Sequence, residues 1–273
     1  MKTFHGILLS LLIPSLLILA SCQKPAQQQE QKAEQKQGVQ TATPSGESAQ
    51  PGVPAKTEPA QSATPAAAPA QPAGGQVVPL EIKLPKPMFV GTPTNIAVPN
   101  LEKPLGRPRP PFLAPAGTKN VAFKKPVTGS DEQPIIGELS MVTDGDKEAA
   151  EGSFVELGPS LQYVTIDLKG RYTIYAIVVW HYHKQAVVYH DVIVQVADDQ
   201  DIITNVQTVF NNDIDNSSGR GVGKDMSYVE TAEGKLIDAR GVIGRYVRLY
   251  SRGNTGNDLN HYIEVEVYGK AVQ

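Results

Sequence analysis

Aromatic rings and imidazoles cluster between residues 180 and 190 of this sequence. Trp180, His181 and His183 follow one another closely, and Tyr189 and His190 come a few residues later. Flat aromatic faces stack on sugar rings or cover the apolar side of a ligand, and imidazole nitrogens donate or accept hydrogen bonds. We therefore expect this segment to form one side of a ligand-binding site.

Asn260 and His261, near the C-terminus, are expected to complete the same recognition surface. A second interpretation is a packed end of the fold, in which Trp180 lies in the core and the histidines bond to loop carbonyls. A third is a Zn²⁺ or Cu²⁺ site on the three histidines of the first segment, because imidazole is a good ligand for both metals.

Motifs for catalysis are missing from the sequence. Neither Gly-x-Ser-x-Gly nor His-Glu-x-x-His occurs. Cys22 is the one cysteine, which excludes disulfides, thiolate catalysis and cysteine-ligated zinc from the rest of the chain. A formal net charge of −3 does not supply the concentrated basic surface that nucleic acids require. We therefore expect a protein that is not an enzyme and does not bind nucleic acid.

The first 21 residues have the pattern of a secretion signal, with Lys2 followed by an apolar run from Ile7 to Ala20. The sequence Leu19-Ala20-Ser21-Cys22 resembles the bacterial lipobox, which implies cleavage before Cys22 and its lipidation. An ordinary signal peptide with an incidental cysteine is the alternative. The resemblance implies a lipid-anchored protein of the bacterial cell envelope. Gln23, in place of aspartate, favours the outer membrane over the inner.

Two segments separate this expected anchor from the remainder of the chain. Residues 22–75 are dominated by Gln, Ala, Pro, Ser and Thr without apolar periodicity, so we expect a disordered tether. Residues 76–117 add apolar side chains among many prolines, which exclude a helix or a central strand. We expect this second segment to be an extended arm laid against the folded domain. The alternative is a polyproline II segment that binds a partner's groove.

Residues 118–273 carry the two-residue alternation of β-strands. The side chains expected to face a core are Val164, Ile166 and Leu168, then Val192, Val194 and Val196, then Val247 and Leu249, and finally Ile263, Val265 and Val267. Tyr172–Trp180 is apolar on both faces and predicts a central strand. Lys169-Gly170 is expected to turn the chain, and residues 211–223 to form a loop.

Six motifs, in this order and at this spacing, resemble a discoidin domain, also called the coagulation factor V/VIII C-terminal type, of the galactose-binding-like superfamily. They are Asp144-Gly145-Asp146, Gln162–Leu168, Tyr175–Trp180, Val192–Asp199, Arg245–Tyr250 and Ile263–Gly269. The resemblance covers about residues 120–270. It implies an all-β, eight-stranded jelly-roll β-sandwich that binds glycans, phospholipid head groups or proteins through loops at one end.

The resemblance also implies a structural Ca²⁺. Asp144, Asp146 and Glu264 occupy the positions that match the cation site of related bacterial domains. Calcium takes six to eight oxygen ligands, which carboxylates and turn carbonyls supply. The alternative is an Asx-type turn beside a solvated glutamate.

Two functions follow as expectations. The first is a surface-displayed module that recognises a glycan or polysaccharide through the loop end. The second is a structural or adhesion lipoprotein that docks onto another envelope or cell-surface protein.

Overall fold

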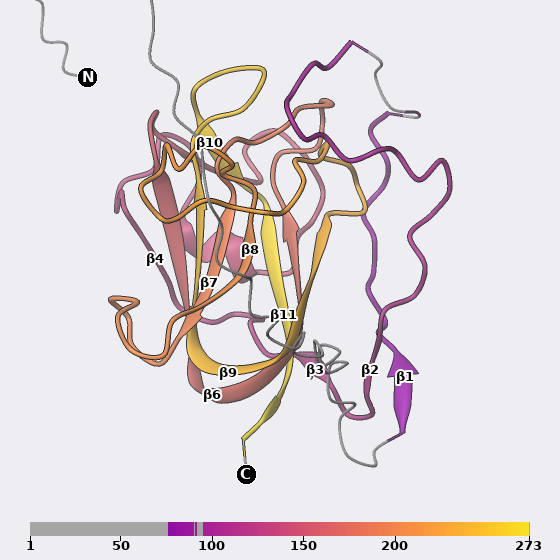
Figure 1. Cartoon of the computed structure of the whole chain (residues 1–273), viewed down its shortest axis with the longest axis vertical. Helices are drawn as coiled ribbons and strands as arrows, with labels where there is room; N and C mark the ends of the chain where they lie inside the picture. The colour runs from indigo at the N-terminus through magenta and orange to yellow at the C-terminus, as the bar shows by residue number, and fades with distance from the viewer. Residues whose placement is uncertain (1–75, 90, 92–94, 273) are drawn as a thin grey trace, which may run out of the picture. The chain divides into compact units, whose positions relative to one another are not determined.

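A computed structural model describes residues 76–89, 91 and 95–272 of the chain. The predicted signal peptide, Cys22 and the tether to residue 75 lie outside these residues. Within them the chain is built of antiparallel strands and one short 3₁₀ helix, η1 (Leu139–Thr143), so the predicted all-β sandwich is confirmed (Figure 1). None of the helical structure in the described ranges has the length and hydropathy needed to cross a membrane.

The strands are named in chain order. They are β1 (Val77–Pro79), β2 (Leu113–Pro115), β3 (Lys119–Asn120), β4 (Val127–Gly129), β5 (Val155–Leu157), β6 (Gln162–Trp180), β7 (Ile193–Ala197), β8 (Gln207–Asn211), β9 (Lys235–Ser251), β10 (Asn260–Tyr262) and β11 (Glu264–Ala271). The main sheet runs β3-β11-β6-β9-β7-β8, with β4 also paired to β6. β5 pairs with β10, and β1 with β2, in two small separate ribbons.

Two long strands, β6 and β9, pair with each other and contribute to both layers of the sandwich. Both strands curve sharply at the lower end in Figure 1, so one continuous sheet folds back over itself. The turn predicted at Lys169-Gly170 is therefore wrong. The ladder shifts register between Asp167 and Tyr172 and then continues, and Lys169 takes a positive φ of 62° at the bend. Such local irregularities allow a strand to bend without leaving its sheet.

The main core lies between the folded halves of this sheet. Ile166, Val194, Val247 and Val265 are all fully buried in it, as the alternating pattern predicts. Ile263 is the exception among the predicted core positions. It precedes β11 and packs in a second apolar cluster instead.

This second cluster covers the outer face of β6. Ala176, Val178 and Trp180 point away from the main core and pack with Tyr268 of β11. β6 is a central strand, as expected, because it pairs with β9 along one edge and with β11 along the other. Ile177 and Val179, on its opposite face, pack in the main core. Burial of the outer face requires a further layer of protein.

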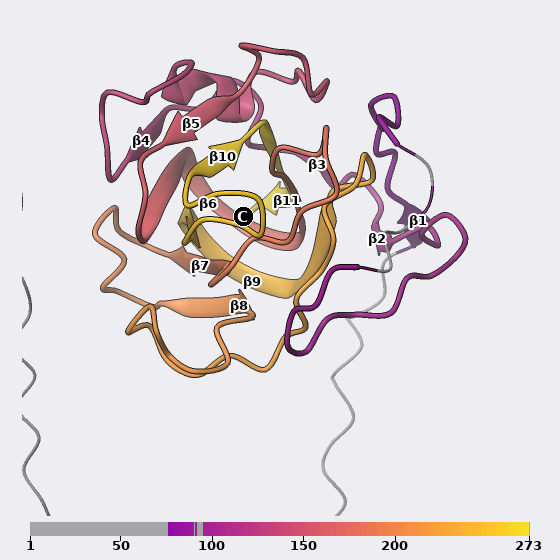
Figure 2. The same ribbon diagram turned by 90° about the horizontal axis from the view of Figure 1, so that it is seen from above.

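The proline-rich arm supplies part of that layer. Leu80, Ile82 and Phe112 pack on the second cluster, while β1 and β2 pair beside it. Figure 2, seen from above, shows β1 and β2 outside the curved main sheet. Further along the arm, Leu101 forms an isolated parallel β-bridge with Ser227. The arm therefore contributes to the folded unit.

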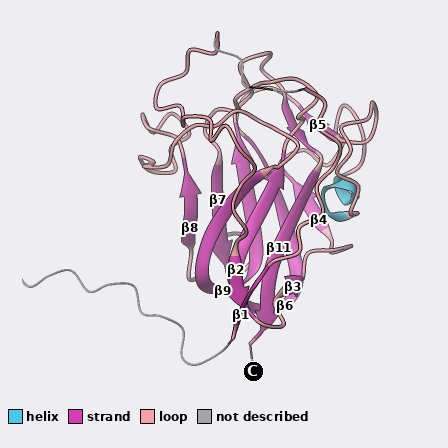
Figure 3. Cartoon of the chain, turned by 90° about the vertical axis from the view of Figure 1, so that its right-hand side faces the viewer, coloured by secondary structure: helices cyan, strands magenta, loops and turns pink. Residues whose placement is uncertain are grey.

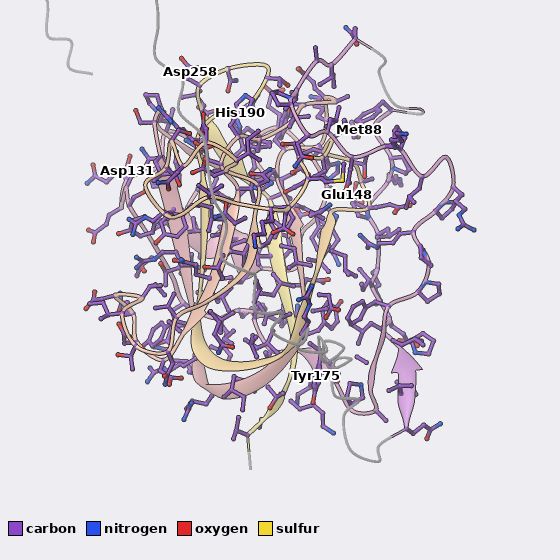
Figure 4. All side chains as sticks on the ribbon, in the orientation of Figure 1. Met88, Asp131, Glu148, Tyr175, His190 and Asp258 are labelled. Atoms are coloured by element: carbon purple, nitrogen blue, oxygen red, sulfur yellow. The ribbon has the colours of Figure 1, made fainter. Side chains whose placement is uncertain are left out.

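Loops gather at one end of the sandwich. Figure 3 shows them crowded above the strands, with the C-terminus at the opposite end. Figure 4 places His190 and Asp258 at this loop end and Tyr175 at the other. The loop end is where the expected recognition residues must be located.

Candidate binding site at the loop end

Trp180 ends β6 and is fully buried. Its Nε1–H donates to the carbonyl oxygen of Ala232 at 3.0 Å. Gly234, at a φ of +63°, lies so close to the indole that a Cβ there would be 2.7 Å from ring atom Cε2. Any larger residue at Gly234 would collide with the ring. Trp180 therefore holds the segment that precedes β9 and offers no face to a ligand.

His181 is also fully buried, and its Nδ1 lies 2.6 Å from Oε1 of the equally buried Glu230. Its ring stacks on Tyr189, with centroids 4.3 Å apart. Among the described residues, His181 Nε2 and Glu230 Oε2 have no hydrogen-bond partner. A buried pair of this kind is costly to break, because the remaining partner keeps its desolvation penalty.

His183 is buried as well and contacts the loop that follows η1. Its Nε2 lies 3.0 Å from the carbonyl oxygen of Lys147, which can only accept, so Nε2–H is the donor. Lys147 in turn reaches Glu266 at 2.7 Å and lies over the Trp180 ring. The imidazole thus fixes the loop in place.

Tyr189, His261 and Glu156 form a hydrogen-bonded chain under the loop end. His261 Nε2 lies 3.0 Å from a carboxylate oxygen of Glu156, and His261 Nδ1 lies 2.7 Å from the Tyr189 hydroxyl. An ionised carboxylate only accepts, so Nε2–H donates to it and Nδ1 accepts from the tyrosine. Burial lowers the pKa of His261, although Glu156 opposes the shift, and burial raises the pKa of Tyr189 well above its usual value.

Asn260 uses its whole side chain inside the protein. Its Oδ1 accepts from the Ser251 hydroxyl and from the Gly253 N–H, each at 2.8 Å. Its amide nitrogen donates to the carbonyl oxygens of Gly158 and Ser160. No donor or acceptor remains for a ligand.

Six of the seven residues predicted to contact a ligand are therefore buried and bonded within the protein. They are Trp180, His181, His183, Tyr189, Asn260 and His261. Their burial agrees with the second interpretation, a packed end of the sandwich, but only His183 bonds to a loop carbonyl, because His181 and His261 bond to side chains instead. The Zn²⁺ or Cu²⁺ interpretation also lacks a site, because the described residues bring together one group of three potential metal ligands, and it contains no histidine.

His190 differs from the other six, because it is exposed. Its backbone forms a short ladder with the loop after β9. The His190 N–H donates to the Gly253 carbonyl at 3.1 Å, and the Arg252 N–H donates to the His190 carbonyl at 2.9 Å. Arg252 is 46% exposed at its side chain, and its guanidinium lies 3.6 Å from Asp191. His190 and Arg252 are thus side by side and open to solvent.

Asp191 belongs to the one group of potential metal ligands, with Asp213 and Asp215, whose carboxylate oxygens lie within 4.8 Å of one another. Hydrogen bonds inside the protein explain much of this group. Asp213 accepts from the backbone of Ser217 and Ser218, and Asp191 accepts from the Ser217 hydroxyl. Burial raises the pKa of Asp191. The sequence indicates only that residues 211–223 form a polar loop.

The predicted calcium ligands are only partly assembled. Asp144 and Asp146 each use one oxygen in successive Asx-type turns, accepting the N–H of Asp146 and of Glu148. Glu264 is fully buried rather than solvated, and the Gly145 N–H donates to its Oε2 at 3.1 Å. Its Oε1 has no hydrogen-bond partner in the part of the chain that is described. Burial raises the pKa of Glu264 to about 9. A buried carboxylate with a free oxygen needs a proton or a cation.

No family model matches the chain, and no curated protein matches it either. Solved structures that are similar to it include three carbohydrate-related proteins. A family 89 glycoside hydrolase from Clostridium perfringens is 18% identical over 56% of this chain and 15% of its own, at a TM-score of 0.41. A Streptococcus pneumoniae fucose binding module is 19% identical over 55% of this chain and 97% of its own, at 0.40. A fucolectin from striped bass serum is 19% identical over 57% of this chain and 50% of its own, also at 0.40.

Proposed function

We propose that the described domain is a non-catalytic glycan-binding module and that its ligand binds at the loop end around His190. One observation carries the proposal. Of the seven residues expected to recognise a ligand, His190 is the one that is exposed, and its backbone is hydrogen-bonded to that of Arg252, whose side chain is also exposed. The other six are buried and bonded within the protein, and among them Asn260 accepts the N–H of Gly253, the residue after Arg252.

The chemistry of this surface suits sugar hydroxyl groups. A hydroxyl both donates and accepts, so neighbouring hydroxyls are matched by a donor and an acceptor side by side. Arg252 supplies a planar fork of donors, Asp191 an acceptor, and His190 one of each when neutral. Backbone hydrogen bonds join the segment at His190 to the segment at Arg252 and Gly253. Because these bonds order the backbone in advance, less conformational entropy is lost when a ligand binds.

A glycan array probed with the full-length protein tests the proposal. We expect the wild-type protein to bind a subset of the arrayed glycans. His190→Ala and Arg252→Ala should each lower the affinity about tenfold, the loss expected when one hydrogen bond to the ligand is removed. Arg240→Ala is the matched control, an exposed arginine in β9 that belongs to neither loop-end segment. If the wild-type protein binds none of the arrayed glycans, the proposal is contradicted.

We also propose that Cys22 anchors the protein to a bacterial outer membrane, and that residues 22–75 hold the domain away from the lipid. The lipobox resemblance supports this. Incorporation of labelled palmitate by a bacterial host should be lost in Cys22→Ser, and equal labelling of both proteins would contradict the anchor.

A structural Ca²⁺ is the third part of the proposal, with Glu264 as its central ligand. The fully buried carboxylate with one unpartnered oxygen supports it. Backbone carbonyls of the loop around Gly145 would complete the coordination, because calcium accepts both carboxylate and carbonyl oxygens. In this role the ion joins the loop after η1 to β11.

A further inference from the structure

A groove of about 750 Å³ lies between the arm and the body of the sandwich. One wall consists of the arm residues 87–89, 91 and 102–109, and the other is the segment Tyr228–Leu236 that leads into β9. Its volume is within the range of sites that hold small ligands or a few sugar rings. Met88, which lines it, is on the loop-end half of the molecule in Figure 4.

Part of the arm wall of this groove is apolar and exposed to solvent. Met88 is 46% exposed and Leu105 is 62% exposed. Phe89 and three prolines extend this apolar part of the wall with ring surfaces. Such a surface covers the C–H faces of a ring-containing ligand.

The charges of the groove are unbalanced. Its lining contains four cationic side chains, Lys103, Arg107, Arg109 and Lys235, but two acidic ones, Glu102 and Glu233. Both acids are already engaged within the protein. Glu102 pairs with Lys235 at 2.6 Å, and Glu233 accepts the backbone N–H of Arg109 at 3.2 Å. Lys103 and Arg107 are exposed and have no ion pair in the described ranges of the chain.

We propose that this groove is a second binding site, separate from the loop end, and that it takes an anionic polysaccharide. The ring surfaces contact the sugar faces, while Lys103 and Arg107 pair with carboxylate or sulfate groups along the chain. A peptide added as a β-strand fits less well. Strand addition needs main-chain N–H donors, and Pro87, Pro104 and Pro108 remove them from the arm wall.

The segment Tyr228–Leu236 and the end of the arm wall at Arg109 are held by bonds within the protein. The segment Tyr228–Leu236 is held from inside by the pair His181–Glu230 and by the bond from Trp180 to Ala232. The arm is tied to the same segment by Arg109, whose Nη1 donates to the Gly234 carbonyl at 2.8 Å. A preorganised groove loses little conformational entropy on binding.

Affinity electrophoresis of the full-length protein tests this site with defined probes. The gels contain polygalacturonate, dextran sulfate or neutral dextran. We expect retardation by one or both anionic polymers and none by neutral dextran. Retardation by polygalacturonate alone identifies carboxylates as the recognised groups, and retardation by dextran sulfate alone identifies sulfates. The double variant Lys103→Glu/Arg107→Glu should weaken the apparent affinity at least about tenfold.

A charge-matched control separates this site from general electrostatics. Lys83→Glu/Lys119→Glu makes the same change in net charge at two exposed lysines that do not line the groove, and it should retain binding. Equal losses in the two double variants would overturn the proposal. So would equal, groove-dependent binding of poly-L-glutamate, which would indicate an acidic peptide as the ligand. The two sites are tested separately, because His190→Ala changes the loop end and leaves the groove intact. Loss of binding in Lys103→Glu/Arg107→Glu therefore reports on the groove, and loss in His190→Ala reports on the loop end.

Discussion

His181 and Glu230 form a fully buried pair, with Nδ1 and Oε1 2.6 Å apart, although they are 49 positions apart in the sequence. The pair connects the end of β6 to the segment that leads into β9. That segment also forms one wall of the arm groove. His181, which was expected to contact a ligand, therefore supports one wall of the arm groove from the inside.

Removal of one member of this pair should be strongly destabilising. We expect Glu230→Ala to lower the free energy of unfolding by about 3–5 kcal/mol, because His181 loses its partner while remaining desolvated. Glu230→Gln keeps a hydrogen-bonding group and should cost less. Equilibrium urea unfolding measures both, with Glu148→Ala as the exposed control. A loss below about 1 kcal/mol for Glu230→Ala would contradict the structural role of the pair.

The arm should stabilise the domain. A chain that begins at Thr118 lacks Leu80, Ile82 and Phe112, and so exposes the second cluster around Val178. We expect it to lose about 3 kcal/mol or more of stability, from apolar side chains returned to water, and to bind a dye that is specific for apolar surfaces. A chain that begins at Gln76 keeps the arm and is the control. Equal melting temperatures for the two chains would contradict this.

Calcium should raise the melting temperature through Glu264. The wild-type protein should melt at a higher temperature in excess CaCl₂ than in EDTA, by an amount equivalent to about 2.7 kcal/mol when calcium is 100-fold above its dissociation constant. Glu264→Gln should not respond, whereas Glu151→Gln, an exposed acid in the loop that follows Asp146, should respond as wild type does. If wild type melts at the same temperature in both buffers, Glu264 is satisfied by a proton.

Acid should remove the stabilisation that the ion pair between Asp167 and Arg245 gives to the folded state. Both of its oxygens accept from Arg245, at 2.8 and 2.9 Å, and this holds the pKa of Asp167 well below its usual value. In the unfolded chain the group protonates near pH 3.9. Its stabilisation is therefore full above that pH and is lost as the pH falls towards the lower folded pKa.

Asp167→Asn should accordingly be less stable than wild type at pH 7, by a modest amount because the pair is partly exposed. The difference in the free energy of unfolding between wild type and Asp167→Asn should be smaller at pH 3 than at pH 7. Asp258→Asn, at an exposed position, controls for the general effect of a lost carboxylate. Urea unfolding at the two pH values gives the comparison, and a difference that stays constant or widens at pH 3 would count against the ion pair.

Much of the fold could be predicted from the sequence because a sandwich buries one face of most strands. Ile166, Val194 and Val247 follow that rule, and the two-sided Tyr172–Trp180 run marked the central strand. The Lys169-Gly170 pair predicts a turn because glycine readily adopts turn conformations. The structure has a bend within β6 at this point, where Lys169 has a positive φ of the kind that turns also use. The N-terminal half of β9 was not expected, since Lys235–Gly244 has little apolar alternation.

The site was harder to predict for a chemical reason. Trp180, His181 and Asn260 have the same donors and acceptors whether they bind a ligand or a neighbouring loop. Which of the two occurs depends on distant partners such as Glu230 and Ala232, in a segment with no periodic pattern. The arm groove depends on two segments more than a hundred positions apart, so no local motif indicates it.

The central claim is that glycans bind at the loop end beside His190. Backbone amide shifts of the full-length protein, followed by NMR as the array-selected glycan is added, test it most directly. We predict saturable changes at residues 189–191 and 252–254, and their loss in His190→Ala. Changes confined to other parts of the domain, or an unaltered titration of His190→Ala, would contradict the claim.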